Sequence, residues 1–376
     1  MSETNLYERY HRQTILPGFG AEGQQKLLRA KVFVVGAGGL GCPVLQYLTA
    51  AGVGTIGIAD DDLVALNNLH RQVLYSVNDI GLSKAERAAD ILRQLNPEIT
   101  ITPHNNRITT QNALALFEHF DIIIDGTDNF AARYMINDAC VLLKKSLVYG
   151  AISQFEGQVS VFKNQDDDDV NYRDIFPDPP KDGEVPNCAE AGVLGVLPGI
   201  VGTMMASETI KIITGIGASL TNQLLTFNAL TNQVHQFSIS AGRETHSQVP
   251  KTSSEFLNID YDWLCSSSGK DEEIDAETFI RLIEKGNVDV IDVREPHELP
   301  TANEFPNIRI PLGQLTNNTN GIEADSVITF CQTGSRSLRA VKILKSIFGE
   351  SKKIYSLRGG ILEWKRRIKH YERKKT

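Results

Sequence analysis

Long hydrophobic runs are absent from this chain. Its 376 residues are 41% hydrophobic and 22% charged, and no apolar stretch approaches the roughly 20 residues that a membrane-spanning helix needs. The first residues, Met1–Arg12, are polar and contain no apolar core of the kind that a signal peptide carries. We therefore expect no membrane segment and a cytoplasmic protein.

An excess of positive charge is also missing. The chain has 38 Lys and Arg residues against 46 Asp and Glu residues, which gives a formal net charge of −8 at pH 7. A surface field of this sign does not attract nucleic-acid phosphates or anionic lipid headgroups. We expect neither nucleic acid nor a membrane as a partner.

Cysteine is scarce for a chain of this length. Five cysteines do not make a disulfide scaffold, and an odd number leaves at least one thiol free. The low cysteine content indicates a reducing compartment. Each thiol is therefore a candidate for a reactive role. The cysteines are Cys42, Cys140, Cys188, Cys265 and Cys331.

The chain length predicts two or three domains. From Lys31 to about Ala151, short β-rich segments alternate with helical patterns. This alternation predicts an α/β fold with a doubly wound, Rossmann-like parallel sheet. The predicted strands are Val32–Val35, Thr55–Ala59, Ile99–Thr102, Ile122–Ile124 and Leu147–Tyr149, and the predicted helices are Leu40–Ala51, Lys84–Leu95 and Ala131–Leu143.

The pattern changes after Tyr149, where longer strands surround an irregular Asp- and Pro-rich segment, Asp166–Pro186. Residues 241–273 are polar and Ser-rich, which indicates a linker, although Phe256–Leu264 is apolar enough to dock. A second, smaller α/β pattern follows, so we predict domains at 1–240 and 274–376. The predicted elements are strands Gly157–Lys163, Gln223–Ala229, Gln233–Ser240, Val288–Val293, Val327–Phe330 and Lys353–Ser356, and helices Ala189–Thr214, Ala276–Lys285 and Ser337–Phe348.

A glycine-rich turn between the first strand and first helix predicts a nucleotide site. The segment Val34–Gly41 contains the pattern G-x-G-x-x-G, in which glycines permit a tight turn and a close backbone approach to phosphate. The following helix offers its free N–H groups and partial positive charge. Asp60 ends the next strand, 19 residues after Gly41, where a carboxylate can accept ribose hydroxyls.

This pattern alone favours an NAD-dependent oxidoreductase, but the neighbouring residues favour another ligand. Arg71, Lys84 and Asp128 follow the carboxyl ends of neighbouring strands, which meet at one edge of a doubly wound sheet. Two cations and a carboxylate suit a triphosphate with Mg²⁺ better than a nicotinamide. Each charge taken alone is typical of a solvated surface.

Several motifs occur together in a fixed order, and with them the chain resembles the MoeB/ThiF (HesA/MoeB/ThiF) family over about residues 5–240. These proteins are bacterial relatives of ubiquitin-activating enzymes. The motifs are Arg9–Gln13, Gly36–Gly41, Asp60–Asp62, Asn67–Gln72, Lys84 and Gly126–Asn129.

The resemblance implies an ATP-dependent adenylyltransferase. Its expected substrate is the C-terminal Gly-Gly carboxylate of a small ubiquitin-like sulfur-carrier protein, with release of pyrophosphate. It implies that Asp60 holds the ribose, that Asn68, Arg71 and Lys84 contact phosphates, and that Asp128 binds Mg²⁺. Arg12 is expected to reach into the partner's site of a homodimer. The implied nucleotide-binding residues are Gly36, Gly38, Gly39, Gly41, Asp60, Asn67, Asn68, Leu69, His70, Arg71, Lys84, Asp128 and Asn129.

Cys188 is a candidate for covalent chemistry. It precedes the predicted apolar helix, and a helix N-terminus lowers the pKa of a thiol. The alternative is a small buried thiol. Its position matches the crossover-loop cysteine of the family, for which the resemblance implies attack on the acyl-adenylate or formation of an acyl disulfide. Cys42 and Cys140 lie in apolar helical patterns and are expected in the core.

Zinc ligands are not recognisable in this chain. Many members of the family carry two Cys-x-x-Cys pairs, which would fall near Asn171–Asp174 and after Ser240. No such pair stands at either place, and tetrahedral zinc needs four nitrogen or sulfur ligands. We therefore predict no zinc site. The segment around residues 166–180 must then be ordered by other contacts or be mobile.

Cys331 opens a second candidate site after a buried-strand pattern. A loop of this form points N–H groups at the sulfur, and Arg336 adds positive charge, so the thiolate can carry a persulfide. Together with Asp292–Glu295 and Leu357–Gly360, the loop resembles the rhodanese family over about residues 274–370. Only four residues separate Cys331 from Arg336, a shorter cradle than the phosphatase loop. The usual Gly-His-Ile segment of rhodaneses is not recognisable in Glu298–Pro306.

The combined prediction is an adenylating domain fused to a sulfur-donating domain. The carrier's carboxylate is activated by ATP, persulfide sulfur on Cys331 attacks, Cys188 assists release, and a thiocarboxylate results. Molybdopterin, thiamine or related sulfur pathways fit equally, and the donor is a cysteine desulfurase or thiosulfate. The alternatives are a non-catalytic, nucleotide-sensing protein that binds the carrier, an inactive rhodanese module, and an NAD-dependent oxidoreductase.

Overall fold

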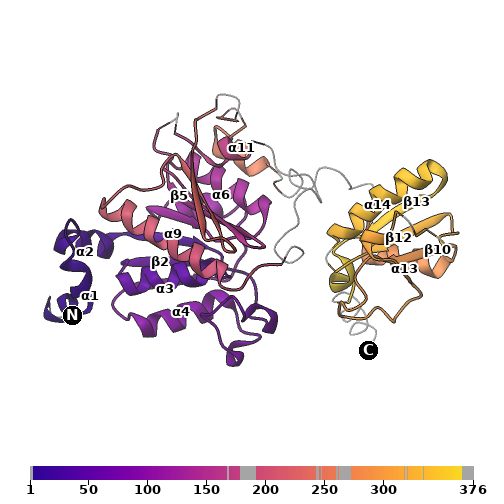
Figure 1. The fold of residues 1–376 in the computed structure, drawn as a ribbon, viewed down its shortest axis with the longest axis horizontal. Helices are drawn as coiled ribbons and strands as arrows, with labels where there is room; N and C mark the ends of the chain where they lie inside the picture. The colour runs from indigo at the N-terminus through magenta and orange to yellow at the C-terminus, as the bar shows by residue number, and fades with distance from the viewer. Residues whose placement is uncertain are drawn as a thin grey trace. The chain divides into compact units, whose positions relative to one another are not determined.

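The structure of the chain, a computed structural model, divides into two compact units (Figure 1). The first contains the described residues up to Tyr261, and the second contains those from Glu272 onwards. The structure describes residues 3–166, 169–177, 192–242, 245–246, 248–259, 261, 272–316, 318–319, 321–332 and 334–365.

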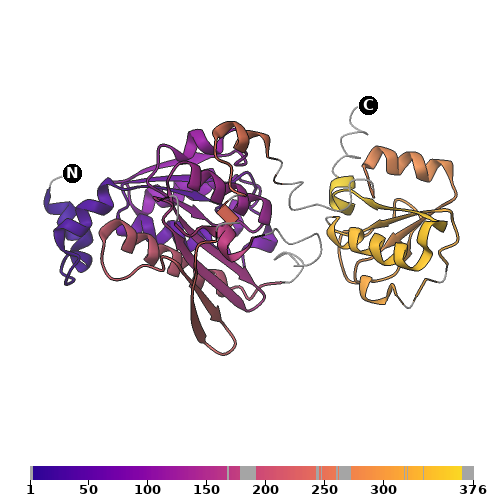
Figure 2. The same ribbon diagram turned by 90° about the horizontal axis from the view of Figure 1, so that it is seen from above.

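An eight-stranded sheet forms the centre of the first unit, in the order β3-β2-β1-β4-β5-β6-β7-β8. The first five strands in this order are parallel, and β6, β7 and β8 continue the sheet in antiparallel fashion. The β7–β8 hairpin extends from the body of the unit (Figure 2), and β8 is exposed along its whole length. The strands are β1 (Lys31–Val35), β2 (Thr55–Ala59), β3 (Thr100–His104), β4 (Ile122–Asp125), β5 (Ser146–Ser153), β6 (Glu156–Phe162), β7 (Gln223–Asn228) and β8 (Gln233–Ser238).

Helices cover both faces of this sheet. On one face α3 packs against α4 and α9, and α9 also covers β5 and β6, while α5 and α6 pack together beside β4 and β5. The predicted doubly wound α/β arrangement is therefore confirmed. The helices are α1 (Glu3–Thr14), α2 (Gly20–Arg29), α3 (Gly41–Ala51), α4 (Lys84–Leu95), α5 (Ala113–Phe117), α6 (Phe130–Leu142), α7 (Tyr172–Ile175), α9 (Leu197–Thr214) and α11 (Ser253–Asn258), with 3-10 turns η1 (Leu66–Asn68) and η2 (Val77–Asp79).

The sheet order places a topological switch between β1 and β4. The chain enters at β1, adds β2 and β3 on one side, and then returns to add β4 and β5 on the other. Both central strands are almost wholly buried, which suits their runs of Val, Phe and Ile. In such sheets the loops diverge at the switch and leave a crevice at the carboxyl ends of the strands.

The helix predicted from Ala189 to Thr214 begins later than expected. Residues 178–191 lie outside the described part, but residues 192–196 are described and are not helical. Here Val193 forms a bridge with Gln154, and the Leu194 N–H donates to Gln154 O at 3.0 Å. The helix α9 starts only at Leu197, with Pro198 in its first turn, a position that proline favours. The prediction was wrong at this end because local apolarity did not reveal the pairing with Gln154.

The described residues between Gly242 and Tyr261 belong to the first unit and contact the rest of it partly through polar groups. The Asp174 carboxylate accepts hydrogen bonds from the Gly242 N–H at 2.8 Å and from the Thr245 hydroxyl. His246 Nε2 lies 3.2 Å from the same carboxylate. The first zinc-binding Cys-x-x-Cys pair of the family would fall near Asn171–Asp174. In this chain, Asp174 connects two distant segments through hydrogen bonds instead.

A buried ion pair lies beneath the same segment. Arg173 donates two hydrogen bonds to the Asp138 carboxylate, at 2.9 and 2.7 Å. The Tyr261 hydroxyl donates a third at 2.7 Å. The ring of Phe256 in α11 is fully buried, which agrees with the expectation that this part of the chain docks. The segment is therefore packed on α6 up to Tyr261.

The second unit has a five-stranded parallel sheet in the order β11-β10-β12-β13-β9. β12 is central and buried, and α14 begins five residues after it ends. The predicted smaller α/β domain is confirmed as a fold. Its elements are β9 (Glu273–Ile274), α13 (Ala276–Lys285), β10 (Val288–Asp292), β11 (Ile308–Arg309), η3 (Leu312–Gln314), β12 (Ser326–Phe330), α14 (Ser335–Phe348), η4 (Gly349–Ser351) and β13 (Lys353–Leu357).

Neither a membrane-spanning helix nor a cluster of metal ligands occurs among the described residues. None of their helices is both long and apolar enough to cross a bilayer. Within the same residues, no three His, Cys, Asp or Glu side chains gather closely enough to hold a metal ion unaided.

Replacing Asp138 with alanine is expected to destabilise the first unit. The variant leaves the Arg173 guanidinium buried without its partner, so we expect a loss of about 3–5 kcal/mol in the free energy of unfolding. Urea denaturation followed by far-ultraviolet circular dichroism measures it. As a matched control, Asp90→Ala removes a carboxylate that is 58% exposed and paired with Arg93, and it should cost less than about 1 kcal/mol. Equal losses in the two variants would refute a structural role for the buried pair.

Candidate functional site

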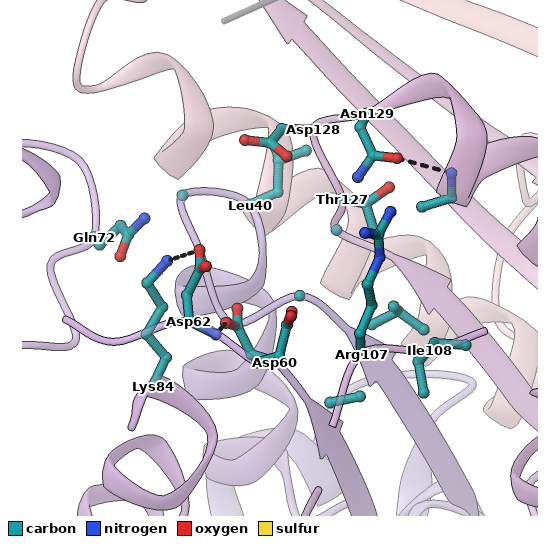
Figure 3. A pocket seen from close by; sticks show the side chains of 18 of the residues that line it. Leu40, Asp60, Asp62, Gln72, Lys84, Arg107, Ile108, Thr127, Asp128 and Asn129 are labelled. Carbon is teal, nitrogen blue, oxygen red and sulfur yellow. Dashed lines mark hydrogen bonds and ion pairs between the residues drawn. The ribbon is translucent and has the colours of Figure 1, made fainter. Parts of the chain in front are cut away.

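A pocket opens at the switch between β1 and β4 (Figure 3). Five parts of the chain line it, each at or beyond the carboxyl end of a parallel strand or at a helix start. This arrangement explains why residues from nearly 100 positions of sequence converge on one crevice. The lining residues are Val35, Gly36, Gly38, Gly39 and Leu40; Ala59, Asp60, Asp61 and Asp62; Arg71, Gln72 and Lys84; Asn106, Arg107 and Ile108; and Gly126, Thr127, Asp128, Asn129, Ala132 and Arg133, together with Ile152 and Val193.

The turn after β1 needs glycine at two places for steric reasons. Gly36 has φ +95°, and a Cβ there would lie 2.7 Å from Gly126 O. A Cβ on Gly41 would lie 1.9 Å from Gly36 O. A side chain fits at neither position, because the obstacles are backbone atoms. Gly38 and Gly39 face the pocket instead, at the amino-terminal end of α3, where helix N–H groups favour an anion.

Asp60 at the end of β2 is held by the same turn. Its Oδ2 accepts a hydrogen bond from the Ala37 N–H at 2.8 Å, and its Oδ1 accepts one from the Asp62 N–H at 2.9 Å. Burial raises the pKa of the Asp60 carboxyl, and the Lys84 ammonium opposes this shift. The side chain lies between Lys84 and Arg107 in Figure 3. It is placed to accept hydroxyl groups of a sugar at the middle of the pocket.

Two cations lie on one side of the pocket. Lys84, the first residue of α4, is 5% exposed, and its Nζ lies 2.8 Å from Asp62 Oδ2. Arg71 lines the same pocket, and its Nη1 donates to Asn67 O at 3.0 Å. With the amino-terminal end of α3, these cations make this side suitable for phosphate groups.

The turn after β4 presents Asp128 to the pocket. Asp125 lies beneath it, fully buried, and accepts hydrogen bonds from the Thr127 N–H at 2.9 Å and the Thr127 hydroxyl at 2.6 Å. Burial raises the pKa of Asp125, and Arg133 lowers it. Arg133 also donates to Thr127 O at 3.3 Å. Because Asn129 caps α6 by accepting from Ala132 N–H at 2.8 Å, the turn is held at both ends.

The structure brings eight of the predicted nucleotide-binding residues into this one pocket. Of the others, Gly41 lies behind the turn at the start of α3, while Asn67, Asn68, Leu69 and His70 belong to the chain before Arg71 and are not in the lining. The residues that line the pocket are Gly36, Gly38, Gly39, Asp60, Arg71, Lys84, Asp128 and Asn129.

Two of the predicted catalytic residues are not found in this pocket: Arg12 lies elsewhere, and Cys188 lies outside the described part of the chain. Arg12 is exposed on α1 and is not in the pocket lining of its own chain. Cys188 lies outside the described residues. The described residues closest after it, 192–196, are not helical, and α9 begins at Leu197, so the activation of the Cys188 thiol by a helix N-terminus stays a prediction. Cys42 and Cys140 are fully buried as expected, and burial raises the pKa of Cys42 to about 12.

Several pocket residues were not among the predicted site residues. Arg107 and Ile108 follow β3, and Arg133 lies one turn into α6. The rule that loops beyond the carboxyl ends of parallel strands meet at the switch could have indicated residues 105–108. Arg133 gave no such signal, because its place in an apolar helix pattern does not show which way it points.

Cys331 follows the central strand β12 of the second unit and is fully buried. The Gly334 N–H donates to its Sγ at 3.1 Å, and Ser337 Oγ lies 3.7 Å away. Gly334 has φ +108° and immediately precedes α14, so this loop needs glycine to begin the helix there. The Gly359–Gly360 turn packs against the loop, with the Ile361 N–H donating to Cys331 O at 2.9 Å.

Charged side chains tie a neighbouring segment to this loop. Arg336, on the first turn of α14, donates to both carboxylate oxygens of Glu298 at 2.6 Å, and this pairing lowers the pKa of Glu298. Arg294 is fully buried, pairs with Asp292 at 2.8 Å and donates to Pro300 O at 2.8 Å. The positive charge predicted for Arg336 is therefore shared with Glu298.

Two family matches divide the chain as its fold does. Residues 10–249 match the ThiF family, and residues 275–367 match the rhodanese-like domain. The probable adenylyltransferase/sulfurtransferase MoeZ of Mycobacterium tuberculosis is 41% identical over 374 residues, which cover 96% of this chain and 93% of the relative. The adenylyltransferase and sulfurtransferase MOCS3 of Xenopus laevis is 36% identical and covers 96% and 86%.

Other relatives match the first unit alone. The sulfur carrier protein adenylyltransferase of Thermus thermophilus is 53% identical over 226 residues, which cover 59% of this chain and 83% of the relative. The crystal structure of Escherichia coli MccB with ATP has the same fold, with a TM-score of 0.54 and 22% identity over 64% of this chain and 73% of that one. The chain therefore belongs to the ThiF family, and its C-terminal unit is a rhodanese-like domain.

Proposed function

We propose that this protein uses ATP and Mg²⁺ to adenylate the C-terminal glycine carboxylate of a small ubiquitin-like sulfur carrier ending in Gly-Gly, and then transfers sulfur to it. The observation that carries the first half is the presence of Arg71, Lys84 and Asp128 in one pocket beside the glycine turn. Family membership supports adenylation over the hydride transfer that a glycine turn alone suggests. In this proposal residues 1–240 adenylate, 274–376 donate sulfur and 241–273 link them.

The first reaction joins the carrier to AMP. A carboxylate oxygen of the carrier attacks the α-phosphorus of ATP, the bond to the β-phosphate oxygen breaks, and pyrophosphate leaves. Negative charge grows on the phosphate oxygens, so Arg71, Lys84 and the amino-terminal end of α3 stabilise the transition state more than the ground state. Asp60 holds the ribose and thereby sets the distance between the α-phosphate and these cations.

The donor set fits Mg²⁺ bound together with a triphosphate. Mg²⁺ is held in many sites by one or two carboxylates with the remaining ligands from phosphates and water. Asp128 supplies a carboxylate, and the hydrogen bonds of Asp125 and Arg133 to Thr127 hold the turn that carries it. When bound, the ion neutralises phosphate charge and orients the leaving pyrophosphate.

The second reaction replaces AMP with sulfur. A persulfide on Cys331 attacks the carbonyl carbon of the acyl-adenylate through its terminal sulfur, and AMP leaves. The Cys188 thiol then attacks Sγ of Cys331, which releases the carrier as a thiocarboxylate and leaves a Cys188–Cys331 disulfide for an external thiol to reduce. A cysteine desulfurase or thiosulfate supplies the sulfane sulfur. A cytoplasmic location is part of the proposal, since this cycle needs a reducing compartment.

Exposed apolar side chains support a homodimer. Six large ones lie between positions 63 and 82, next to the pocket segment, and concentrations of this kind are typical of protein interfaces. Arg12 is then available to the partner's pocket rather than its own. The six are Leu63, Leu66, Val73, Val77, Ile80 and Leu82.

Replacing Cys331 with alanine separates the two reactions. We expect carrier-dependent ATP–pyrophosphate exchange to stay within about twofold of the wild type, because the substitution lies in the other unit. Thiocarboxylate formation, measured by mass spectrometry of the carrier, should be lost. Loss of exchange in this variant would refute the division of labour.

Replacing Asp128 with alanine tests the metal role. We expect exchange to fall by a factor of at least about 10², the range seen when one electrostatic group of an active site is removed. The Mg²⁺ concentration that gives half-maximal exchange in the residual activity should rise. Asp121→Ala, outside the pocket lining, is the control and should exchange normally. An unchanged Mg²⁺ requirement would exclude Asp128 from this role, and ATP binding without exchange in the wild type would favour the nucleotide-sensing alternative.

Mixing two inactive variants tests whether Arg12 acts across a dimer. Arg12→Ala and Lys84→Ala homodimers should each lack exchange. After subunit exchange, half of the dimers are mixed, and each contains one site with both residues intact, so activity should return to about a quarter of the wild type. Absence of recovery, with mixed dimers confirmed by native mass spectrometry, would place Arg12 outside the partner's site.

A further inference from the structure

A second cavity adjoins the proposed ATP pocket. It has a volume of about 380 Å³ and lies between the loop 107–110, α6 and the docked residues Leu257, Asn258, Ile259 and Tyr261. Arg107, Ile108 and Ala132 line both cavities, so they form the partition between them. The far wall comes from a segment that sequence patterning treated as linker.

The layout of the pocket indicates which end of a nucleotide lies at this partition. Figure 3 shows Lys84 and Gln72 on one side, Asp60 in the middle, and Arg107 on the other side. Phosphates, ribose and base follow one another linearly in ATP. With phosphates beside Lys84 and ribose at Asp60, the base lies toward Arg107 and Ile108.

The backbone that carries Arg107 is fixed from both sides. Asn112 donates to Arg107 O at 2.9 Å and accepts from the Thr109 N–H at 2.8 Å. Before the loop, Asn105 accepts from the Ser83 hydroxyl at 2.5 Å. The Arg107 side chain is exposed and extends toward Thr127 and Asn129 in Figure 3. Shortening this side chain therefore opens the partition without displacing the loop.

We propose that Arg107 determines base specificity by closing the base subsite against the second cavity. The inference rests on the proposed function, because it needs ATP in the pocket. The guanidinium blocks the edge of the purine that lies remote from the ribose and bears the 6-amino group. The planar face of the guanidinium also suits contact with an aromatic ring. ATP is accepted, and purines extended at that edge are rejected.

The second cavity can hold such an extension. Cavities of about 150 Å³ lined by apolar side chains already bind benzene, and this one is larger. Met135, Leu257 and Ile259 contribute apolar surface to it. A benzyl group on the 6-amino nitrogen of ATP therefore finds both space and a suitable lining once the Arg107 side chain is removed.

The test compares ATP with N6-benzyl-ATP on the full chain. For Arg107→Ala, we expect the ratio of kcat/KM for the analogue over ATP in carrier-dependent exchange to rise by at least about tenfold, the discrimination a steric pocket typically gives. Arg107→Lys, which keeps a long side chain, should show a smaller rise. Arg29→Ala, an exposed arginine on α2, should keep the wild-type ratio.

A second variant identifies the space that the benzyl group uses. Leu257 is 41% exposed, so Leu257→Trp is compatible with folding while it fills the second cavity. Added to Arg107→Ala, it should return the ratio to within about twofold of the wild type. If the gain persists in this double variant, the analogue enters by another route and the proposal is wrong.

Binding measured without the carrier separates this inference from the proposed function. Isothermal titration calorimetry with each nucleotide should show the same change in ratio as exchange does. A wild type that catalyses no exchange would refute the proposed function, and the binding ratio would still decide on Arg107. An unchanged binding ratio in Arg107→Ala would overturn the partition, even if the wild type exchanges normally.

Discussion

The contact between the turns that follow β1 and β4 determines the shape of the pocket. The Gly126 N–H donates to Val35 O at 2.8 Å, and Gly36 approaches Gly126 so closely that no side chain fits between them. This approach places the start of α3 beside the Thr127–Asn129 turn. The N–H groups at the start of α3 and the Asp128 carboxylate therefore share one crevice, which Asp60, Arg71 and Lys84 also line.

The site combines fixed polar groups with charges that face the opening. Asp125 and Arg133 are buried and hold the Thr127 backbone, whereas Asp62 is 71% exposed beside Lys84. Buried hydrogen-bonded groups change position little when a ligand arrives, so the cost of organising the site is met during folding. The exposed carboxylate of Asp62 pairs with Lys84, and in the proposed function a phosphate group competes with it for this cation.

The two units carry their candidate sites at equivalent points of two different sheets. In each, a buried central parallel strand ends in a glycine-containing turn that leads into a helix, α3 in the first unit and α14 in the second. The first turn is open and faces a wide pocket, which suits a nucleotide. In the second, the Gly334 N–H donates to Cys331 Sγ, which suits a single sulfur atom. The two turns differ because an open pocket lies before α3, whereas the Cys331 side chain lies before α14.

Local patterns predicted much of the fold. The helices Lys84–Leu95 and Ala276–Lys285 have the predicted bounds, because each has an N-cap side chain and a clear apolar face. The apolar character of Phe256–Leu264 also indicated that this part docks. The start of α9 and the hydrogen bonds from Gly242 and Thr245 to Asp174 were not predictable in this way, since both depend on partners distant in sequence. Arg107 was missed for the same reason: its role depends on the neighbours that the sheet order gives it.

The glycines of the β1–α3 turn differ in whether folding alone requires them. At Gly36 and Gly41 a methyl group collides with backbone, so a descendant that had lost every ligand would still need glycine there to fold. At Gly38 a Cβ would meet only the flexible end of Gln72, at 3.4 Å. Drift away from glycine at position 38 therefore marks the loss of nucleotide use more reliably than an intact motif marks its retention.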